Sequence, residues 1–330
     1  MATKPLEILL YGALVYGLLD TLKSKLTTPA NITRLKENTA PDVLAAHMAN
    51  ADVVIALKYD AMPPAPKLRL LQVPGAGLDQ IQFDQVPKQA TLCNAYGHDV
   101  AGGEYVVLAM LAWCHEFVPA HESLKAGSWV MSGRTGAPLH EELHGKTVGI
   151  LGLGPIGLAA ARLAKAFGTT VLGCNRTIRE KPEFIDEIYS LAELDHFLAR
   201  CDFVAVCIAQ TSQTIGLINR NSFQQMKPTA AIINVARGLV IDEDALYDTL
   251  KERRIAGAII DAWYNYPTPD NLSIPPSKHP FHELPNVLMT PHSSIWTTGM
   301  IARRWAAIAN NIDQFAGGGP LTHVVRLAVV

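Results

Sequence analysis

The sequence predicts an α/β protein built on doubly wound parallel sheets, and three observations support this. Glycines spaced as G-x-G-x-x-G stand between a short apolar run and an Ala/Leu-rich segment of helical spacing, within residues 145–176. Strand-like and helix-like segments alternate on both sides of that stretch, which is typical of parallel sheets covered by helices. At 330 residues the chain exceeds one ordinary core, so we expect two domains.

The central stretch reads GKTVGILGLGPIGLAAARLAKAFGTTVLGCNR and predicts a βαβ unit. In this motif Gly152 permits a tight turn, Gly154 lets the backbone approach a pyrophosphate, and Gly157 lets helix and strand pack closely. Pro155 suits the first helical position, and Ile156 follows it; backbone N–H groups at such a helix start attract phosphates. An ordinary turn without a ligand is the alternative, but strand, motif and helix together favour a dinucleotide.

The end of the second strand in this unit bears on which dinucleotide is preferred. An Asp or Glu roughly 20 residues past the glycines contacts the ribose of NAD. Here that place is held by Asn175, Arg176 and Thr177, with Arg179 close by. These side chains can bond a 2′-phosphate, which a carboxylate would repel. The sequence therefore predicts a preference for NADP(H), and a surface turn that accepts NAD as well is the alternative.

Composition and charge exclude several classes of protein. The chain is 49% hydrophobic and 18% charged with a net charge of −2, so neither nucleic acid nor a membrane surface is an expected partner. No run approaches about 18 apolar residues, and the apolar start at 6–19 is interrupted by Glu7, so neither a membrane span nor a signal peptide is expected. The five cysteines form no C-x-x-C motif, so we expect buried thiols, no metal site and a cytoplasmic location.

The elements on either side of the central stretch follow from apolar runs and helix signals. Residues 117–143 are expected to be irregular and to form an arm over a partner subunit, and Pro/Ser-rich residues 267–281 to form a lid or a surface loop. The glycine-flanked turn after the strand at 68–73 either exposes N–H groups to a small anion or is a plain turn. The expected strands are 8–10, 53–56, 68–73, 147–151, 169–172, 202–209, 230–236, 257–263 and 286–290. The expected helices are 42–48, 104–114, the one after Gly154, a short one after the capping box at 190–193, 219–227 and 242–253.

In this order, several pieces resemble the D-isomer-specific 2-hydroxyacid dehydrogenase family. They are GAGLD (75–79), GKTVGILGLGPIG (145–157), MKPTAAIINVARGLVIDEDAL (226–246), GAIIDAW (257–263), LPNVLMTPHSS (284–294) and GGGPLTHVV (317–325). The resemblance implies two Rossmann-like domains: a dinucleotide domain, 99–291, inserted into a flavodoxin-like substrate domain, 1–98 and 292–330. It also implies a homodimer, joined largely through the helix that starts near Asp99 and the arm after it.

The resemblance also implies roles for residues at the strand ends. Arg237 is similar to the family's substrate arginine, and its guanidinium fork can hold a carboxylate and polarise a carbonyl. His292, in TPHSS, is similar to the family's acid/base, which suits a side chain whose ordinary pKa is about 6.5.

The remaining implied contacts concern the cofactor and the substrate carboxylate. Asp261 resembles the residue that binds the nicotinamide carboxamide, and Ala236 lies where the family contacts the cofactor. The backbone N–H groups of Ala76 and Gly77 resemble the family's carboxylate cradle.

The chain departs from the family at the third catalytic position. The family has a Glu before a Pro that pairs with the His, and formate dehydrogenases have Gln; here the residue is Tyr266, followed by Pro267. Without the carboxylate, His292 is expected to titrate closer to its ordinary pKa. Two interpretations of Tyr266 stay open: its hydroxyl orients the imidazole, or its ring lines the pocket.

The predicted function is hydride transfer between NADP(H) and a small 2-oxo or 2-hydroxy acid, of the glyoxylate/hydroxypyruvate reductase type. Two alternatives follow from Tyr266. One is oxidation of formate or phosphite without a carboxylate–histidine pair, and the other is a regulatory protein that binds a dinucleotide.

Overall fold

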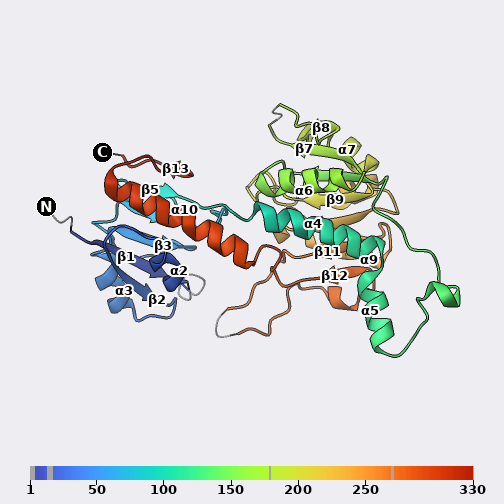
Figure 1. Ribbon diagram of the computed structural model, residues 1–330, viewed down its shortest axis with the longest axis horizontal. Helices are drawn as coiled ribbons and strands as arrows, with labels where there is room; N and C mark the ends of the chain where they lie inside the picture. The colour runs from blue at the N-terminus through green and yellow to red at the C-terminus, as the bar shows by residue number, and fades with distance from the viewer. Residues whose placement is uncertain (1–3, 13–17, 178–179, 269–270, 330) are drawn as a thin grey trace. The chain divides into compact units, whose positions relative to one another are not determined.

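The computed structural model describes residues 4–12, 18–177, 180–268 and 271–329 (Figure 1). Arg179 and part of the apolar start, 13–17, lie outside the described residues. By contacts along the chain, Met1–Gly97 and Thr297–Val330 form a first compact unit, and His98–Trp296 forms a second.

The first unit is built on a six-stranded sheet of order β13-β5-β4-β3-β1-β2 among the described residues. All pairs are parallel except β13 with β5. The order 2-1-3-4-5 is that of flavodoxin-like folds. The strands are β1 Leu6–Tyr11, β2 Ala30–Leu35, β3 Val53–Ala56, β4 Leu70–Gln72, β5 Thr91–Cys93 and β13 Val324–Arg326, and the helices are α2 Leu19–Lys23, α3 Pro41–Met48 and α10 Thr298–Gly317.

Both faces of this sheet are buried because successive strand residues point to opposite sides. On one face Leu10 packs in a cluster with Trp305 and Ile308 of α10. On the other face Leu9 packs in a cluster with Met48 of α3. The C-terminal residues thus complete the core of the unit that the N-terminal residues begin.

The second unit is built on a parallel seven-stranded sheet of order β12-β11-β10-β9-β6-β7-β8 in the described part of the chain. The order reverses between β6 and β9, and ligands of doubly wound sheets bind at such a switch point. The strands are β6 Thr147–Leu151, β7 Thr170–Asn175, β8 Glu187–Ser190, β9 Phe203–Val206, β10 Ala231–Asn234, β11 Gly257–Ile260 and β12 Val287–Met289. The helices are α4 Asp99–Cys114, α5 Phe117–Lys125, α6 Pro155–Ala166, α7 Leu194–Arg200, α8 Arg220–Gln225 and α9 Glu243–Lys251, with short 3₁₀ turns η1 Gly133–Thr135, η2 Leu191–Glu193, η3 Gly238–Val240 and η4 Phe281–Glu283. The predicted α/β class with two Rossmann-like sheets is confirmed.

Local sequence signals explain where several helices of this unit begin. The Asp242 carboxylate accepts the N–H of Ala245 at 2.8 Å and caps α9. Ser190 and Glu193 form the predicted capping box at η2. Helix α4 packs tightly on α6. A Cβ at Gly102 would lie only 2.9 Å from the side chain of Ile156 on α6, so glycine permits this close approach.

The prediction that residues 117–143 are irregular is wrong at both α5 and η1. None of the residues of α5 is buried, so no core packs against this helix. Its exposed apolar side chains continue into the following segment; examples are Phe117, Leu124, Trp129, Val130 and Leu139.

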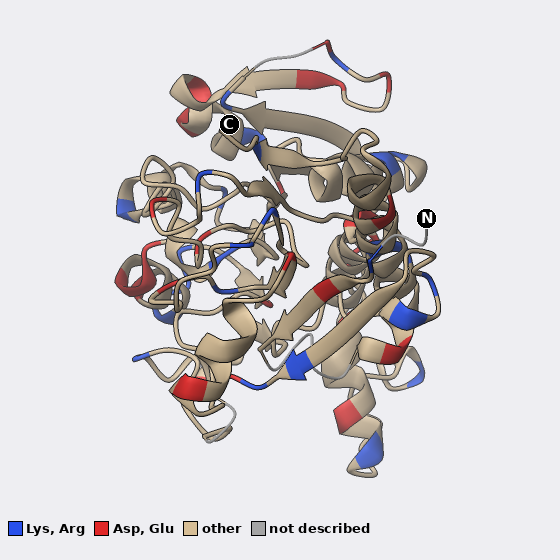
Figure 2. Cartoon of the chain, turned by 90° about the vertical axis from the view of Figure 1, so that its left-hand side faces the viewer, with Lys and Arg blue, Asp and Glu red and all other residues tan. Residues whose placement is uncertain are grey.

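Lys and Arg residues are interspersed with Asp and Glu residues over the drawn chain (Figure 2). Among the described residues, no helix is both long and apolar enough to cross a membrane, and no group of three or more His, Cys, Asp or Glu side chains is arranged to hold a metal ion. All five cysteines are unpaired, and burial raises the pKa of Cys174 and of Cys201 to about 12.

Candidate active site

The glycine turn after β6 lies at the switch point of the second sheet. Gly152 has φ +101°, and a Cβ there would lie 2.5 Å from the backbone nitrogen of Ile208, which follows β9. A Cβ at Gly157 would collide with the carbonyl oxygen of Gly152. Both positions therefore require glycine for contacts inside the protein itself.

Gly154 is different, because the space beside it is open. A Cβ built there meets no atom within 4 Å. Gly154 is the N-cap of α6 and supplies no side-chain cap, and Pro155 has no N–H to offer. The N–H groups at the start of α6, including that of Ile156, are therefore without a side-chain cap beside open space, which fits a phosphate group.

The residues predicted to determine the preference between NADP(H) and NAD(H) lie at the end of β7. The Asn175 side chain donates to the Thr177 carbonyl at 3.0 Å, which orders the turn. Arg176 Nη1 lies 3.4 Å from the side-chain oxygen of Gln213. The turn presents an amide, a guanidinium and a hydroxyl and contains no carboxylate at 175–177.

Arg237 follows β10 in an extended conformation, half-buried, just before η3. Asn234 fixes its backbone: the Asn234 side chain accepts the N–H of Ala236 at 3.1 Å and donates to the Arg237 carbonyl at 3.1 Å. Arg237 Nη1 donates to the Ala236 carbonyl at 3.0 Å. A Cβ at Gly238 would collide with the carbonyl of Trp263, so the Arg237 turn lies directly against the end of β11.

Asp261, at the end of β11, holds the loop that carries His292. Its side chain is buried, and its Oδ1 accepts the Thr290 hydroxyl at 2.6 Å and the Ser293 N–H at 2.9 Å. Its Oδ2 accepts the Ser294 N–H at 3.1 Å. Between these bonds His292 has φ +54°, a left-handed conformation that costs about 1–2 kcal/mol for such a residue. The carboxylate offsets that cost by binding the N–H groups that the turn aims at it.

Thr290, at the start of the same loop, is held from two further elements. Its hydroxyl lies 2.5 Å from that of Tyr105 on α4, whose pKa is raised mainly by burial. Its carbonyl accepts the indole N–H of Trp263 at 2.8 Å. Trp263 is itself buried, with its ring edge-on to Phe281, as expected for a core aromatic.

Tyr266 and His292 form a hydrogen-bonded pair. The Tyr266 hydroxyl oxygen lies 2.6 Å from His292 Nδ1, and the two rings are edge to face with centroids 5.2 Å apart. The backbone N–H of Trp263 donates to the same hydroxyl oxygen at 3.1 Å. Tyr266 thus lies where a partner of the histidine belongs, and its hydroxyl contacts the imidazole directly.

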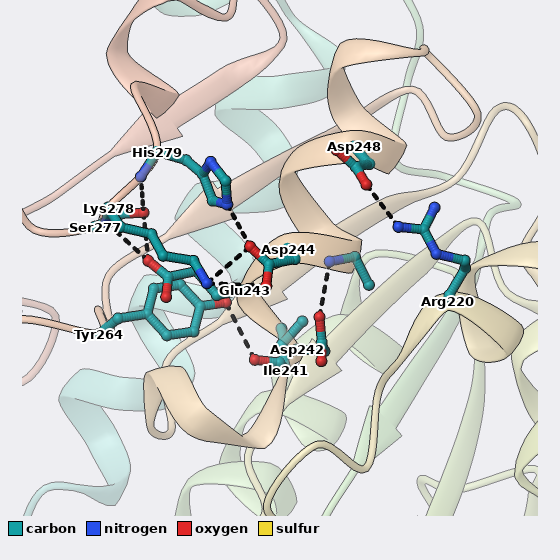
Figure 3. A network of polar contacts seen from close by, with 11 residues as sticks. Arg220, Ile241, Asp242, Glu243, Asp244, Asp248, Tyr264, Ser277, Lys278 and His279 are labelled. Atoms are coloured by element: carbon teal, nitrogen blue, oxygen red, sulfur yellow. Dashed lines mark hydrogen bonds and ion pairs between the residues drawn. The ribbon is translucent and has the colours of Figure 1, made fainter.

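The loop after Tyr266 is fastened to α9 (Figure 3). Glu243 accepts the hydroxyl of Ser277 at 2.6 Å and the N–H of Lys278 at 2.9 Å. Asp244 binds the side chains of Lys278 and His279, and this hydrogen bonding, from Lys278 first, holds its pKa below the usual value. The far end of the 267–281 loop, at 277–279, is therefore anchored at the start of a helix.

The other two predicted substrate residues lie in the first unit. Ala76 and Gly77 follow β4 and are half-buried, and the Ala76 carbonyl accepts the side-chain N–H of Asn94 at 3.0 Å. The structure thus brings Arg237, Asp261, Tyr266 and His292 to neighbouring strand ends within one unit and places Ala76 and Gly77 in the other.

Three supporting residues were not predicted from the sequence: Asn234, Thr290 and Ser294. Each acts through hydrogen bonds of its side chain or its backbone to a predicted residue. Thr290 and Ser294 flank His292 in the quoted TPHSS segment, so that motif was the signal available for two of them.

A parallel sheet that reverses at a glycine turn, beside a helix start without a side-chain cap, defines a dinucleotide-binding Rossmann protein. Comparison with known proteins narrows this class. The chain belongs to the D-isomer specific 2-hydroxyacid dehydrogenase family, whose NAD binding domain model matches residues 107–294.

Named relatives agree with this assignment. The glyoxylate reductase of Korarchaeum cryptofilum is 30% identical over 300 residues, covering 87% of this chain and 86% of that protein. The D-3-phosphoglycerate dehydrogenase of Archaeoglobus fulgidus is 32% identical over 276 residues, covering 82% of this chain; the chain spans about half of that relative, 50% of its length. Among solved structures, a D-isomer specific 2-hydroxyacid dehydrogenase from Xanthobacter autotrophicus Py2, in complex with NADPH and MES, has a TM-score of 0.78 at 25% identity and covers 98% of both chains.

Proposed function

We propose that this chain transfers hydride between NADP(H) and C2 of a small 2-oxo or 2-hydroxy acid, as a glyoxylate- or hydroxypyruvate-type reductase. The observation that carries the proposal is the packing of Gly238 against the carbonyl of Trp263. It sets the backbone of the Arg237 turn beside the turn that leads to the Tyr266–His292 pair. A 2-oxo acid needs both groups, a fork for its carboxylate and a proton donor for its carbonyl.

In this proposal Arg237 binds the substrate carboxylate and polarises the neighbouring carbonyl. Its backbone is held by Asn234, so the fork is oriented before the substrate arrives. His292 gives a proton to the carbonyl oxygen during reduction and takes it back during oxidation. The Asp261 carboxylate keeps His292 in place by binding the loop around it.

A bound nicotinamide dinucleotide supplies or accepts the hydride. The open space beside Gly154 and the uncapped start of α6 fit its pyrophosphate. Asn175, Arg176 and Thr177 would hold a 2′-phosphate, which supports NADP(H) as the preferred form. The Xanthobacter structure in complex with NADPH supports the same preference.

The substrate class follows from the relatives and from the first unit. Glyoxylate reductases are among the relatives that resemble most of this chain. We assign the backbone N–H groups of Ala76 and Gly77 to the substrate carboxylate, and Asp261 and Ala236 to the nicotinamide side of the cofactor.

Tyr266 favours a second candidate function. Formate oxidation to CO₂ transfers a hydride and no proton, so it needs no carboxylate–histidine pair, and no carboxylate stands at position 266. This candidate keeps the same cofactor site and replaces the 2-oxo acid by formate or phosphite.

The purified protein with NADPH and, separately, NADH is the direct test. We expect oxidation of NADPH with glyoxylate or hydroxypyruvate, compared with pyruvate and phenylpyruvate, and no NADP reduction by formate or phosphite. Turnover of formate or phosphite alone would establish the second candidate instead. Tight NADPH binding without turnover of any of these compounds would contradict both and favour a regulatory dinucleotide-binding protein.

We further propose that the chain is a homodimer of the cytoplasm. The exposed apolar side chains on α5 and after it, among them Phe117, Trp129 and Leu139, support a partner surface. The unpaired thiols support a reducing compartment. Light scattering on the wild type and on Trp129→Glu should give twice the chain mass and the single chain mass; a monomeric wild type would contradict the dimer.

A further inference from the structure

We propose that Tyr266 is a proton-relay residue: it holds neutral His292 with the proton on Nε2 and gives its own proton to Nδ1 as Nε2 protonates the substrate. The inference rests on the proposed reduction of a 2-oxo acid and deepens it. The family resemblance implied a carboxylate at this position, which could not act in this way because an ionised carboxylate only accepts hydrogen bonds.

The proposed direction of the Tyr266–His292 bond is supported by a third partner. A backbone N–H can only donate, so the N–H of Trp263 takes one lone pair of the Tyr266 oxygen, 3.1 Å away. The hydroxyl oxygen lies 2.6 Å from His292 Nδ1, and in the proposed relay its proton points at that nitrogen. Neutral imidazole carries one proton, and an Nδ1 that accepts leaves that proton on Nε2.

A neutral histidine alone is a poor acid for the carbonyl oxygen, because losing the Nε2 proton would leave an imidazolate. Delivery of a proton to Nδ1 at the same moment avoids that species. Tyrosine suits this task, since its ordinary pKa of about 10 keeps it protonated where histidine, at about 6.5, has already lost its second proton.

The hydride supplied by the reduced dinucleotide adds to C2, the Nε2 proton moves to the carbonyl oxygen, and the Tyr266 proton moves to Nδ1. The products are the 2-hydroxy acid, the oxidised dinucleotide, neutral His292 with its proton on Nδ1, and a tyrosinate at position 266. The tyrosinate oxygen accepts the N–H of Trp263 and the new Nδ1–H, and water reprotonates it because the Tyr266 residue is 44% exposed.

Tyr266 is positioned from both sides. The N–H of Asn265 donates to the Pro276 carbonyl at 2.9 Å, just before the segment fastened to α9 (Figure 3). On the other side, Trp263 is tied through its indole to Thr290, two residues before His292. Among the described residues, the charged and titratable groups on the surrounding elements include Arg237, Asp261, Tyr105, Tyr264, Lys278, His279 and His282, all of which Tyr266→Phe leaves in place.

The first test needs no substrate. In ¹⁵N-histidine-labelled protein without ligands, the ring nitrogens of His292, assigned by their loss in His292→Asn, should show an unprotonated Nδ1 and a protonated Nε2 above pH 7. A protonated Nδ1 in the neutral ring would overturn the inference, whether or not the protein reduces 2-oxo acids.

The second test measures the reductive pH profile. With glyoxylate or the best 2-oxo acid found, wild-type kcat/KM should hold within about twofold from pH 7 to about pH 9, whereas Tyr266→Phe should fall roughly tenfold per pH unit above about pH 7. Tyr264→Phe is the matched control, because its hydroxyl lies in the same turn but donates to the Ile241 carbonyl, and its profile should follow the wild type.

Solvent isotope effects give an independent reading of the same step. In mixed H₂O and D₂O, under conditions where deuterated NADPH shows that hydride transfer limits the rate, the wild type should give a curved proton inventory from two moving protons. Tyr266→Phe should give a straight line from one. Coincident pH limbs and straight lines in both proteins would overturn the relay, while activity itself would leave the proposed function standing.

Discussion

Gly238 and Trp263 are in backbone contact, although β11 and the helix before it separate them in sequence. A Cβ at Gly238 would collide with the Trp263 carbonyl group. Through this contact the turn bearing Arg237 lies against the turn bearing Tyr266. Two side chains that we propose to act on the same small substrate are thus positioned by backbone packing.

Gly238→Ala should therefore damage both stability and activity. Overpacking at a buried backbone contact costs about 1–3 kcal/mol, which lowers Tm by several degrees. We expect kcat/KM to fall further than stability alone explains, because the two turns are forced apart. Gly133→Ala is the control, since a Cβ there meets nothing within 4 Å. Equal Tm and kcat/KM in the two variants would contradict the importance of the contact.

Arg237→Lys should lower kcat/KM by roughly 10²–10³-fold with the cofactor affinity unchanged. Lysine keeps the charge and loses the planar fork that binds a carboxylate through two hydrogen bonds. Steady-state kinetics with the 2-oxo acid measure this, with Arg220→Lys, an exposed arginine paired with Asp248, as the control. Near-normal activity would remove Arg237 from the mechanism.

Asp261→Asn separates two roles of the same side chain. An amide cannot accept from Thr290, Ser293 and Ser294 as the carboxylate does, so we expect a loss of about 1–3 kcal/mol in the free energy of unfolding. If Asp261 acts mainly by holding the His292 loop, kcat falls while the Kd for NADPH stays within about threefold. A large rise in that Kd with little change in kcat would instead favour its proposed contact with the nicotinamide. Asp195→Asn, at an exposed position on α7, controls for loss of charge.

Asn175→Asp should shift the dinucleotide preference from NADPH towards NADH. A carboxylate at the end of β7 repels the 2′-phosphate of NADPH and can bond the ribose of NADH. We expect the ratio of kcat/KM for NADPH to that for NADH to fall about tenfold or more. A wild type that already prefers NADH would refute the reading of residues 175–177.

The Lys165–Asp186 pair predicts a pH dependence of stability. The hydrogen bond from Lys165, at 2.7 Å, lowers the pKa of Asp186 below its ordinary value, and the N–H of Val171 adds to this. Because the folded pKa is lowered, the stabilisation is present above the ordinary pKa of about 4 and is lost as the pH falls through the folded value. Asp186→Asn should cost up to about 1 kcal/mol at pH 7, since the pair is partly exposed, and little near pH 2. Urea denaturation at both pH values measures this, and a constant difference would contradict it.

The sequence predicted the buried strands of the second unit well, because a strand covered on both faces is an apolar run between turn signals. It missed β2 and β8, which are half-exposed edge strands of mixed polarity. Helix α5 was also not predicted from the sequence, and none of its residues is buried. Burial does not account for every miss, because the sequence analysis also missed β5, which is buried throughout, and α10, which packs Trp305 and Ile308 into the core.

The candidate site, too, could be predicted from the sequence only in part. The positions of Arg237 and His292 at strand ends followed from segment order, and a departure at Tyr266 was visible by counting from Asp261. The direction in which the Asp261 carboxylate turns did not follow from the sequence, nor did the N–H of Trp263 beneath the Tyr266 hydroxyl. Both depend on loop geometry, which a residue pattern does not encode.

The division of the first unit between the two ends of the chain bears on how the protein is made. Its edge strand β5 is covered by β13, and its sheet by α10, both of which follow residue 297. A ribosome adding 5–20 residues per second needs roughly 10–45 s to move from the end of the first segment to these elements. During that time the central unit is being synthesised, while residues 1–97 present an uncovered sheet edge and an unfinished core. Chaperone protection of the nascent chain should thus be needed most by this segment, which leaves the ribosome before the elements that complete its sheet.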